Sequence, residues 1–369
     1  MPQPAAYSDA LRAADLRACR SLLRGGSRSF YAASFLLPRR VRDPATALYA
    51  FCRLADDAVD LGHEGTDAIA VLRRRLDAAY HGVPAAHPAD RAFADAVACY
   101  AIPKELPEAL LDGFAWDKAG HTYETIDELL NYAARVAGTV GAMMALLMGR
   151  REKEAVARAC DLGMAMQLTN IARDIGEDAL AGRLYMPRAW MREAGLDPEA
   201  WMNNPVFCQE IADVTRRILG AADRLYEQAD AGIGRLPADC RPGITAARLL
   251  YSEIGNAVAL QGWNSVDRRA VVPSVRKAEL LANALRSLTR TPPWRAQAPS
   301  EASRFLVDAA SASACGGTGP VAGLAWWDVR GRMLFVLALF ERLERRERAY
   351  LPSQQSVKSL SARQVAEPV

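Results

Sequence analysis

The 369-residue sequence predicts an all-α protein, built as one large bundle of helices. Hydrophobic residues make up 51% of the chain, with Ala and Leu abundant and runs of β-branched residues scarce, a composition that favours helices over strands. Apolar residues recur at helical spacing between glycine and proline residues that mark segment ends. A chain of this length can bury a large core.

Taken in order, the periodicity predicts helices at 7–23, 27–38, 43–62, 66–80, 88–100, 104–118 and 126–148. The next helix covers 154–170 and runs on for about four turns from residue 167. Further helices are expected at 206–236, 243–265, 275–288 and 324–350. Pro44 stands where the first turn of the third helix is expected. Residues 289–323 are rich in Pro, Ser, Ala and Gly and predict a linker or loosely ordered excursion. We therefore expect a main domain at 1–290, an excursion at 291–323, a helix at 324–350 and a disordered tail at 351–369.

Charge and motif content exclude several classes of protein. Lys and Arg number 46 against 43 Asp and Glu, which lacks the basic excess of a nucleic-acid binder. Seven cysteines without CxxC spacing indicate reduced, buried thiols in a cytosolic protein. The four histidines lack zinc-ligand spacing. We expect no signal peptide and no transmembrane helix, because no basic start with a long apolar core and no run of eighteen apolar residues is found.

An acidic face lies on the helix in the stretch QLTNIARDIGEDALAGRLYMPR, residues 167–188. Asn170, Asp174 and Asp178 recur every four residues and therefore share one face. Neighbours such as Leu168 and Ile171 are apolar, which indicates that the helix packs into an interior. Polar acceptors there are costly unless they are paired, protonated or bound to a cation.

A second acidic face lies on the helix expected at 43–62. Asp56 and Asp60 are four residues apart, with Arg53 about one turn earlier. Like charges at this spacing destabilise a helix by a few tenths of a kcal/mol. One such pair is more often a solvated face than a site. Two pairs, each on a long apolar helix, are harder to explain in that way.

Small residues crowd the stretch VAGTVG, residues 136–141. A glycine inside a helix costs about 1 kcal/mol relative to alanine, and is tolerated where something must come close. Two explanations remain open: tight packing against another helix, or the wall of a cavity that accepts a long apolar chain.

Four carboxylates that face each other across a cavity repel unless divalent cations lie between them. Hard cations such as Mg²⁺ take carboxylate and substrate-phosphate oxygens, and can neutralise a diphosphate leaving group as its C–O bond breaks. An apolar cavity would keep the resulting carbocation away from water. This chemistry predicts an isoprenoid diphosphate substrate. A di-metal oxidase would need Glu and Glu-x-x-His ligands, and a nucleotide enzyme a glycine-rich phosphate motif; neither is found.

Four blocks of the sequence, SRSF (27–30), YAFCRLADDAVD (49–60), YAARVAGTVG (132–141) and QLTNIARDIGEDALAGRLYMP (167–187), resemble the squalene/phytoene synthase family. The likeness is greatest to bacterial members of carotenoid biosynthesis and covers roughly residues 20–290. It implies an isoprenoid synthase fold, a single bundle around a central cavity, over the main domain. It also implies a prenyltransferase that uses Mg²⁺ or Mn²⁺ and condenses two prenyl diphosphates head to head.

The resemblance also implies roles for individual residues. The metal ligands are Asp56, Asp60, Asp174 and Asp178, assisted by Asn170. Arg53 binds diphosphate, and Tyr132 and Tyr251 are active-site tyrosines. Either Arg268 or Arg269 contacts phosphate, and the register does not decide which. The remaining substrate-binding residues implied are Ser27, Ser29, Phe30, Tyr49, Val136, Ala137, Gln167 and Leu168.

For the reaction, the resemblance implies two geranylgeranyl diphosphates that give phytoene through prephytoene diphosphate, with release of two diphosphates and no NADPH. The alternative within the family is a C15-using enzyme that makes squalene, dehydrosqualene or hydroxysqualene, because chain length depends on cavity depth. Other classes are an inactive assembly subunit, which tends to lose the aspartates, and a helical scaffold with solvated acidic faces.

The expected location is the cytoplasm. Because the implied product is a C40 hydrocarbon, peripheral membrane contact is a hypothesis, with the amphipathic segment at 324–350 as its candidate. Contact with other carotenoid enzymes is a further hypothesis.

Overall fold

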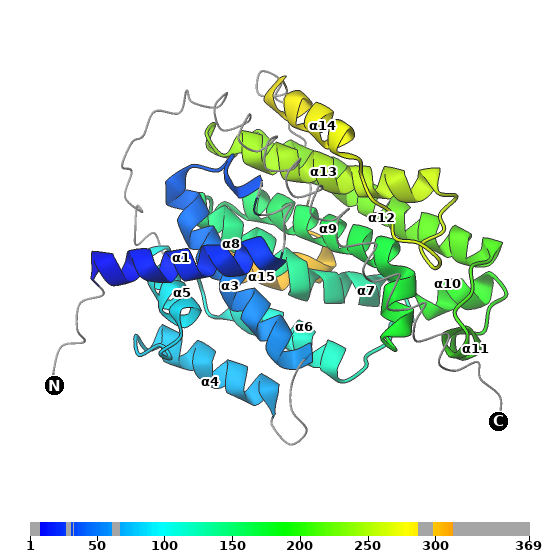
Figure 1. The fold of residues 1–369 in the computed structure, drawn as a ribbon, viewed down its shortest axis with the longest axis horizontal. Coiled ribbons are helices and arrows are strands. Elements are labelled where there is room, and N and C mark those ends of the chain that lie inside the picture. Colours follow the sequence, from blue (N-terminus) through cyan, green and yellow to red (C-terminus); the bar gives the residue numbers. More distant parts are fainter. Residues whose placement is uncertain (1–7, 27–30, 32, 61–66, 287–297, 313–369) are drawn as a thin grey trace, which may run out of the picture.

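One long helix, α9 (Lys153–Leu180), lies at the centre of a bundle of helices (Figure 1). The computed structural model describes residues 8–26, 31, 33–60, 67–286 and 298–312, apart from the side chains of some residues at helix ends, Asp56 and Asp60 among them. All regular structure in these ranges is helical, which confirms the all-α prediction.

The other elements surround α9 and follow in chain order. They are α1 (Asp9–Gly26), α3 (Arg39–Asp60), α4 (Ala68–Tyr80), α5 (Pro88–Cys99), α6 (Glu105–Lys118), α7 (Ile126–Ala133), the π-helix η1 (Ala134–Gly138), α8 (Thr139–Leu147), α10 (Arg188–Glu193), α11 (Pro198–Asn203), α12 (Gln209–Ile233), α13 (Arg241–Leu260), α14 (Ser274–Arg286), η3 (Glu301–Ser303) and α15 (Arg304–Ala312). The predicted segment at 27–38 is mostly outside the described residues, and 324–369 are wholly outside them.

Two glycine contacts let α9 approach the η1–α8 segment closely. A Cβ added to Gly141 would lie 2.0 Å from the Ala159 carbonyl oxygen, and one added to Gly163 would lie 2.2 Å from that of Ala137. Any side chain at either glycine would therefore push the two backbones apart. Tight helix packing thus explains Gly141 in the VAGTVG stretch, one of the two explanations left open.

The helix predicted over 126–148 is interrupted by the π-helical turn η1. A π turn adds a residue to the helix and is frequent at functional sites. By length and composition, Ile126–Leu147 could cross a membrane, but 56% of its apolar window is buried inside the protein. Its contacts with α9 and α6 make it a core helix of the bundle.

The helix predicted from Asp43 begins earlier, at Arg39, and contains Pro44. Proline lacks the N–H that would bond the carbonyl four residues back, here that of Arg40. The Tyr100 hydroxyl donates to that carbonyl instead. The side chain of Tyr100, the residue that caps the C-terminus of α5, thus replaces the missing backbone bond. The residues around Pro44 by themselves do not reveal this partner.

Helix α13 ends at Leu260, five residues before the predicted end. Gly262 and Trp263 follow with φ angles of 67° and 62°, a left-handed turn that no helix can contain. Arg268 and Arg269 therefore lie in a loop and not at a helix C-terminus, so compensation of the helix dipole does not account for them.

The described part of the predicted excursion, residues 298–312, is not loosely ordered. Helix α15 buries Leu306, Val307 and Ala310 in the main core. Leu306 reaches within 3.4 Å of a Cβ placed on Gly138 of η1. Composition suggested a linker because small residues are common in linkers and equally common where a short helix packs closely.

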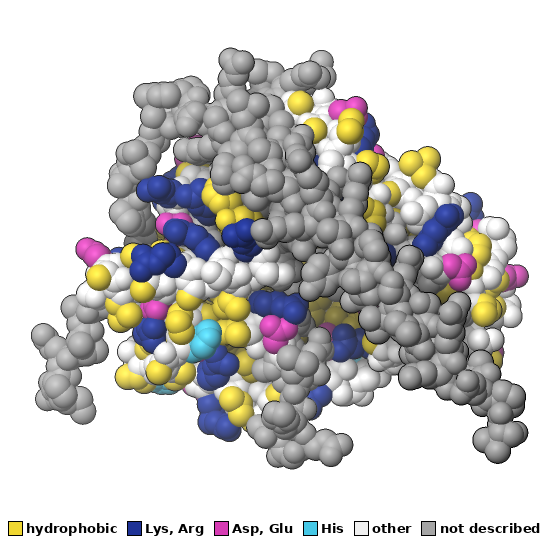
Figure 2. Space-filling view, viewed as in Figure 1, with side chains coloured by type: hydrophobic (Ala, Val, Ile, Leu, Met, Phe, Trp, Pro, Cys, Tyr) yellow, Lys and Arg dark blue, Asp and Glu magenta, His cyan; other side chains and the backbone are white. Residues whose placement is uncertain are grey.

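The six described cysteines are free thiols. Three of them are buried, Cys52 and Cys208 are partly buried, and Cys99 is exposed, so the expectation of buried thiols is wrong for Cys99. Figure 2 shows Lys and Arg side chains in several separate groups on one face, among apolar and neutral ones.

Replacing Gly141 by alanine should lower the free energy of unfolding by about 1–3 kcal/mol, because the new methyl group meets backbone that cannot move independently. The matched control is Gly220→Ala on α12, where the nearest atom to an added Cβ is 4.0 Å away; it should stabilise by about 0.5–1 kcal/mol. Chemical denaturation of both variants checks this. Equal stability of the two would contradict the contact.

Candidate active site

An apolar cavity of about 350 Å³ runs beside α9, between it and α3, η1–α8, α12 and α13. From α9 it is lined by positions 155, 158, 159, 162, 163, 166, 167 and 170, whose spacing is one face of a helix. Its walls are chiefly apolar, from residues such as Leu37, Leu48, Met144, Met148, Ile233 and Ile244.

Three of the four residues expected in the apolar wall, Tyr49, Val136 and Ala137, do line this cavity. Gln167, Asn170 and Tyr251, predicted as polar site residues, line it as well. Leu168 does not: it is fully buried in the core. A step of one residue turns a helix by about 100°, so Leu168 points away from the face that carries Gln167.

The polar lining residues Gln167, Asn170 and Tyr251 come from the C-terminal half of α9 and the middle of α13. The Asn170 Oδ1 atom is buried and has no hydrogen-bond partner in the described part of the chain. A buried acceptor of this kind calls for a donor or a cation. Burial raises the pKa of Tyr251 to about 12, so its phenol stays neutral and able to donate.

Asp174 is held between two guanidinium groups. Arg173 donates to its carboxylate at 2.7 and 2.5 Å, and Arg269 at 2.8 and 3.3 Å. Arg268 donates instead to the Gln261 carbonyl oxygen at 3.1 Å. The structure thus places Arg269, of the two candidates, at the second acidic motif. Arg173 was missed, although its position beside Asp174 was a signal in the sequence.

Gly176 brings the loop that carries Arg269 onto α9. Its N–H donates to the Ser265 carbonyl at 2.9 Å, and an added Cβ would lie 2.1 Å from the Val266 carbonyl oxygen. Asn264 braces the same loop by accepting from two of its N–H groups. The glycine between the two aspartates is therefore what lets Arg269 reach Asp174.

Asp178 lies one turn further along α9 and is partly buried. Burial, with the charge on Asp174 as a second cause, raises its pKa to about 7, while Arg183 opposes the shift. Two carboxylates crowded at the edge of an interior favour a proton or a cation.

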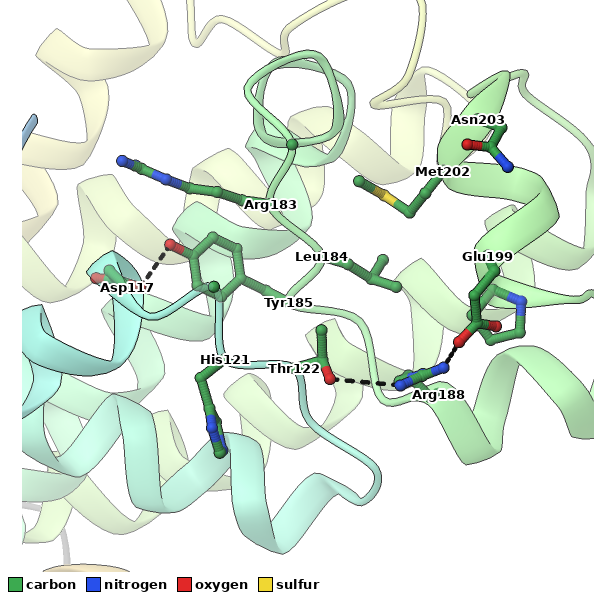
Figure 3. A pocket seen from close by; sticks show the side chains of 13 residues that line it. Asp117, His121, Thr122, Arg183, Leu184, Tyr185, Arg188, Glu199, Met202 and Asn203 are labelled. Carbon is green, nitrogen blue, oxygen red and sulfur yellow. Dashed lines mark hydrogen bonds and ion pairs between the residues drawn. The ribbon is translucent and has the colours of Figure 1, made fainter.

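Tyr132 is buried and donates to a carboxylate that the sequence did not single out. Its hydroxyl lies 2.8 Å from one oxygen of Asp117, and the Tyr185 hydroxyl lies 2.8 Å from the other. Burial is the main cause that raises the Tyr132 pKa well above its usual value. Figure 3 shows Tyr185 and Asp117 at the edge of a second, polar pocket. Tyr185 stands in the block RLYMP, which was a missed signal.

The first acidic motif is only partly described. Arg53 forms an ion pair with Asp57 at 2.6 Å and is not among the residues that line the cavity. The side chains of Asp56 and Asp60, and residues Ser27, Ser29 and Phe30, lie outside the described residues. Among the described side chains, no three His, Cys, Asp or Glu converge to hold a metal ion.

A buried ion pair lies beside the end of the cavity near the start of α9. Arg158 lines the cavity there with Ala155 and Ala159, and its guanidinium lies 2.8 Å from Asp161. From Asn170 to Ala155 the lining positions of α9 span a helical rise of about 22 Å. The cavity is therefore elongated along α9, with chiefly apolar walls.

A helical bundle that encloses such a cavity defines an enzyme of the isoprenoid synthase fold. The family model described as Squalene/phytoene synthase matches residues 23–277. The chain belongs to the squalene/phytoene synthase family, and is a prenyltransferase, as the resemblance implied.

Similar proteins are named as synthases of this family. The phytoene synthase of Rhodobacter capsulatus is 53% identical over 281 residues, covering 75% of this chain and 83% of its own. The 15-cis-phytoene synthase of Pantoea ananas is 36% identical, covering 73% and 92%. The crystal structure of a dehydrosqualene synthase superposes with a TM-score of 0.70 at 30% identity, covering 75% of this chain and 97% of that chain.

The raised pKa of Asp178 predicts a pH effect on stability. The folded chain keeps a proton on this group up to about pH 7, whereas the unfolded chain releases it near pH 4. The folded state therefore loses relative stability as pH rises between these values. Thermal unfolding from pH 5 to pH 8 should show a smaller loss in Asp178→Asn than in the unmodified protein. Identical pH profiles for the two proteins would contradict the assignment.

Proposed function

We propose that this chain catalyses the head-to-head condensation of two geranylgeranyl diphosphates to phytoene, with release of two diphosphates. The observation that carries the proposal is the cavity: a narrow apolar tunnel alongside α9 with Asn170, Gln167 and Tyr251 in its wall and Asp174 one turn beyond Asn170. Relatives named phytoene synthase, up to 54% identical over most of both chains, support the same reaction.

The residues at the polar end fit a divalent cation with a diphosphate. Asn170 Oδ1 is an unsatisfied buried acceptor, and Asp174 and Asp178 add carboxylates on the same face of α9. We assign these three, with Asp56 and Asp60 of α3, to hold Mg²⁺ or Mn²⁺, hard ions that prefer oxygen ligands. When bound, the ion supplies charge neutralisation of the departing diphosphate.

The protein's own residues then bind and shield the substrates. Arg173 and Arg269 hold guanidinium groups beside Asp174, where each can donate two parallel bonds to a phosphate. Tyr251 and Gln167 offer neutral donors. The apolar walls exclude water, so that the allylic cation from one substrate alkylates the C2–C3 double bond of the other and, after proton loss, gives prephytoene diphosphate. A second ionisation, rearrangement and proton loss complete phytoene without a reductant.

The second candidate is condensation of C15 units to squalene, dehydrosqualene or hydroxysqualene. The similarity to a dehydrosqualene synthase structure at 30% identity favours it. The length of the cavity favours the C20 substrate, because its lining continues one turn past Ala159 to Ala155. Peripheral membrane contact and contact with other carotenoid enzymes remain predictions, and the candidate segment at 324–350 lies outside the described residues.

Purified protein with Mg²⁺ should convert geranylgeranyl diphosphate to phytoene, with no gain from NADPH, and should do so better than it converts farnesyl diphosphate. Asp56→Ala and Asp174→Ala should each lose at least about 3 kcal/mol of transition-state stabilisation. Product analysis by chromatography and diphosphate release measure both. Consumption of the C15 substrate alone would overturn the proposal, and full activity of both variants would contradict the assignment of Asp56 and Asp174 as metal ligands.

Ala159→Leu should shift the preference toward the C15 substrate, because the larger side chain fills the tunnel where the fourth isoprene unit is expected to lie. Each added methylene in an apolar pocket changes discrimination by about 1 kcal/mol or more. The ratio of kcat/KM for the C20 and C15 diphosphates measures the shift. A ratio that stays the same in a folded variant would place the tail elsewhere.

A further inference from the structure

A carboxylate outside both acidic motifs joins two of the phenols beside the site. Asp117 lies near the end of α6 and accepts the Tyr132 hydroxyl on one oxygen and the Tyr185 hydroxyl on the other, each at 2.8 Å. Charge-assisted bonds of this kind are stronger than bonds between neutral groups. The arrangement draws together three segments, namely α6, α7 and the stretch that follows α9; Figure 3 shows Asp117 and Tyr185 from two of them.

The three groups stand at the second acidic motif. Tyr132 lies one turn before Val136, which with Ala137 of the π-helix η1 lines the cavity. Tyr185 and Asp178 both border a small gap between α9 and the stretch that follows it. The aromatic rings of Tyr132 and Tyr185 are stacked with their centroids 5.3 Å apart, so neither ring turns without the other.

The two hydrogen bonds determine whether each phenol can donate a further hydrogen bond or only accept one. A phenol has one proton, and Tyr132 and Tyr185 each give theirs to Asp117. What remains on the oxygen of each phenol is lone-pair electron density, so neither phenol has a proton left to donate to diphosphate.

We propose that Asp117 is a positioning residue for the reaction: by accepting from both phenols it fixes the orientation of Tyr132 and Tyr185 beside the second acidic motif. The inference rests on the proposed function. It assigns to Asp117 no contact with the substrate and no metal ion.

Asp117→Asn tests this with nearly unchanged shape. An amide offers one acceptor oxygen and one donor nitrogen, so one of the two phenols must reverse its hydrogen bond. We expect kcat to fall about ten-fold or more while KM stays within about two-fold, because the loss is felt in the transition state. In a Tyr132→Phe background the same change should cost much less, since the residue through which Asp117 acts is already altered.

Two matched controls are available. Asp112→Asn, on the same helix, breaks only an exposed ion pair with Arg73 and should leave kcat unchanged. Tyr123→Phe removes a hydroxyl from a ring that lies 5.2 Å from Tyr132, but whose buried oxygen has no hydrogen-bond partner within the described ranges. It should keep full activity, whereas Tyr185→Phe, which removes one of the two donors to Asp117, should lower kcat.

The outcomes separate this inference from the proposed function. If the unmodified protein converts no prenyl diphosphate, the proposed function fails. If it is active and Asp117→Asn matches Asp112→Asn, or if the losses in Asp117→Asn and Tyr132→Phe simply add, the positioning role is overturned. Should Asp117→Asn fail to fold by circular dichroism, Tyr185→Phe against Tyr123→Phe decides: a selective fall in kcat supports the role, and equal kcat values overturn it.

Discussion

The burial of polar side chains on helix α9 is the constraint on which the rest of this structure depends. Helix α9 is surrounded by other helices, yet it carries an amide and two carboxylates on one face. Burial of such groups is unfavourable unless each finds a partner. The protein meets the cost at Asp174 with two guanidinium groups. At Asn170 and Asp178 the cost remains, as an unsatisfied oxygen and a raised pKa. An orphan acceptor and a carboxyl group with a raised pKa on one face suit the binding of a charged ligand.

Glycines determine where the neighbours of α9 lie. Gly163 lets the π-helical turn touch α9, and Gly176 lets the loop after α13 do so. The first contact brings cavity-lining residues of η1 against the helix, and the second brings Arg269 to Asp174. Backbone approach and site chemistry are thus coupled, because the same helix that supplies the acidic face supplies the close contacts that place its partners.

Much of the fold could be predicted, because helical periodicity and glycine or proline punctuation are local signals. The failures have non-local causes. Pro44 can lie inside α3 because the hydroxyl of Tyr100, the residue that caps α5, donates to the Arg40 carbonyl that would otherwise lack a partner. Composition did not predict helix α15, because its small residues are also typical of a linker. The burial of Leu306 and Val307 in the core is visible only in the folded protein. Leu168 was assigned to the cavity by a motif match, although the helix turns it away.

By itself, the sequence determined the helical class, the two acidic motifs and the residue types that suit a metal and a diphosphate, because these follow from spacing along single helices. Only the tertiary structure decided that Arg269 and not Arg268 meets Asp174, that Asp117 holds Tyr132 and Tyr185, and that the cavity extends along α9 to Ala155. The physical reason is that each of these depends on the approach of segments far apart in the chain. Helical spacing specifies a face, but not what packs against it.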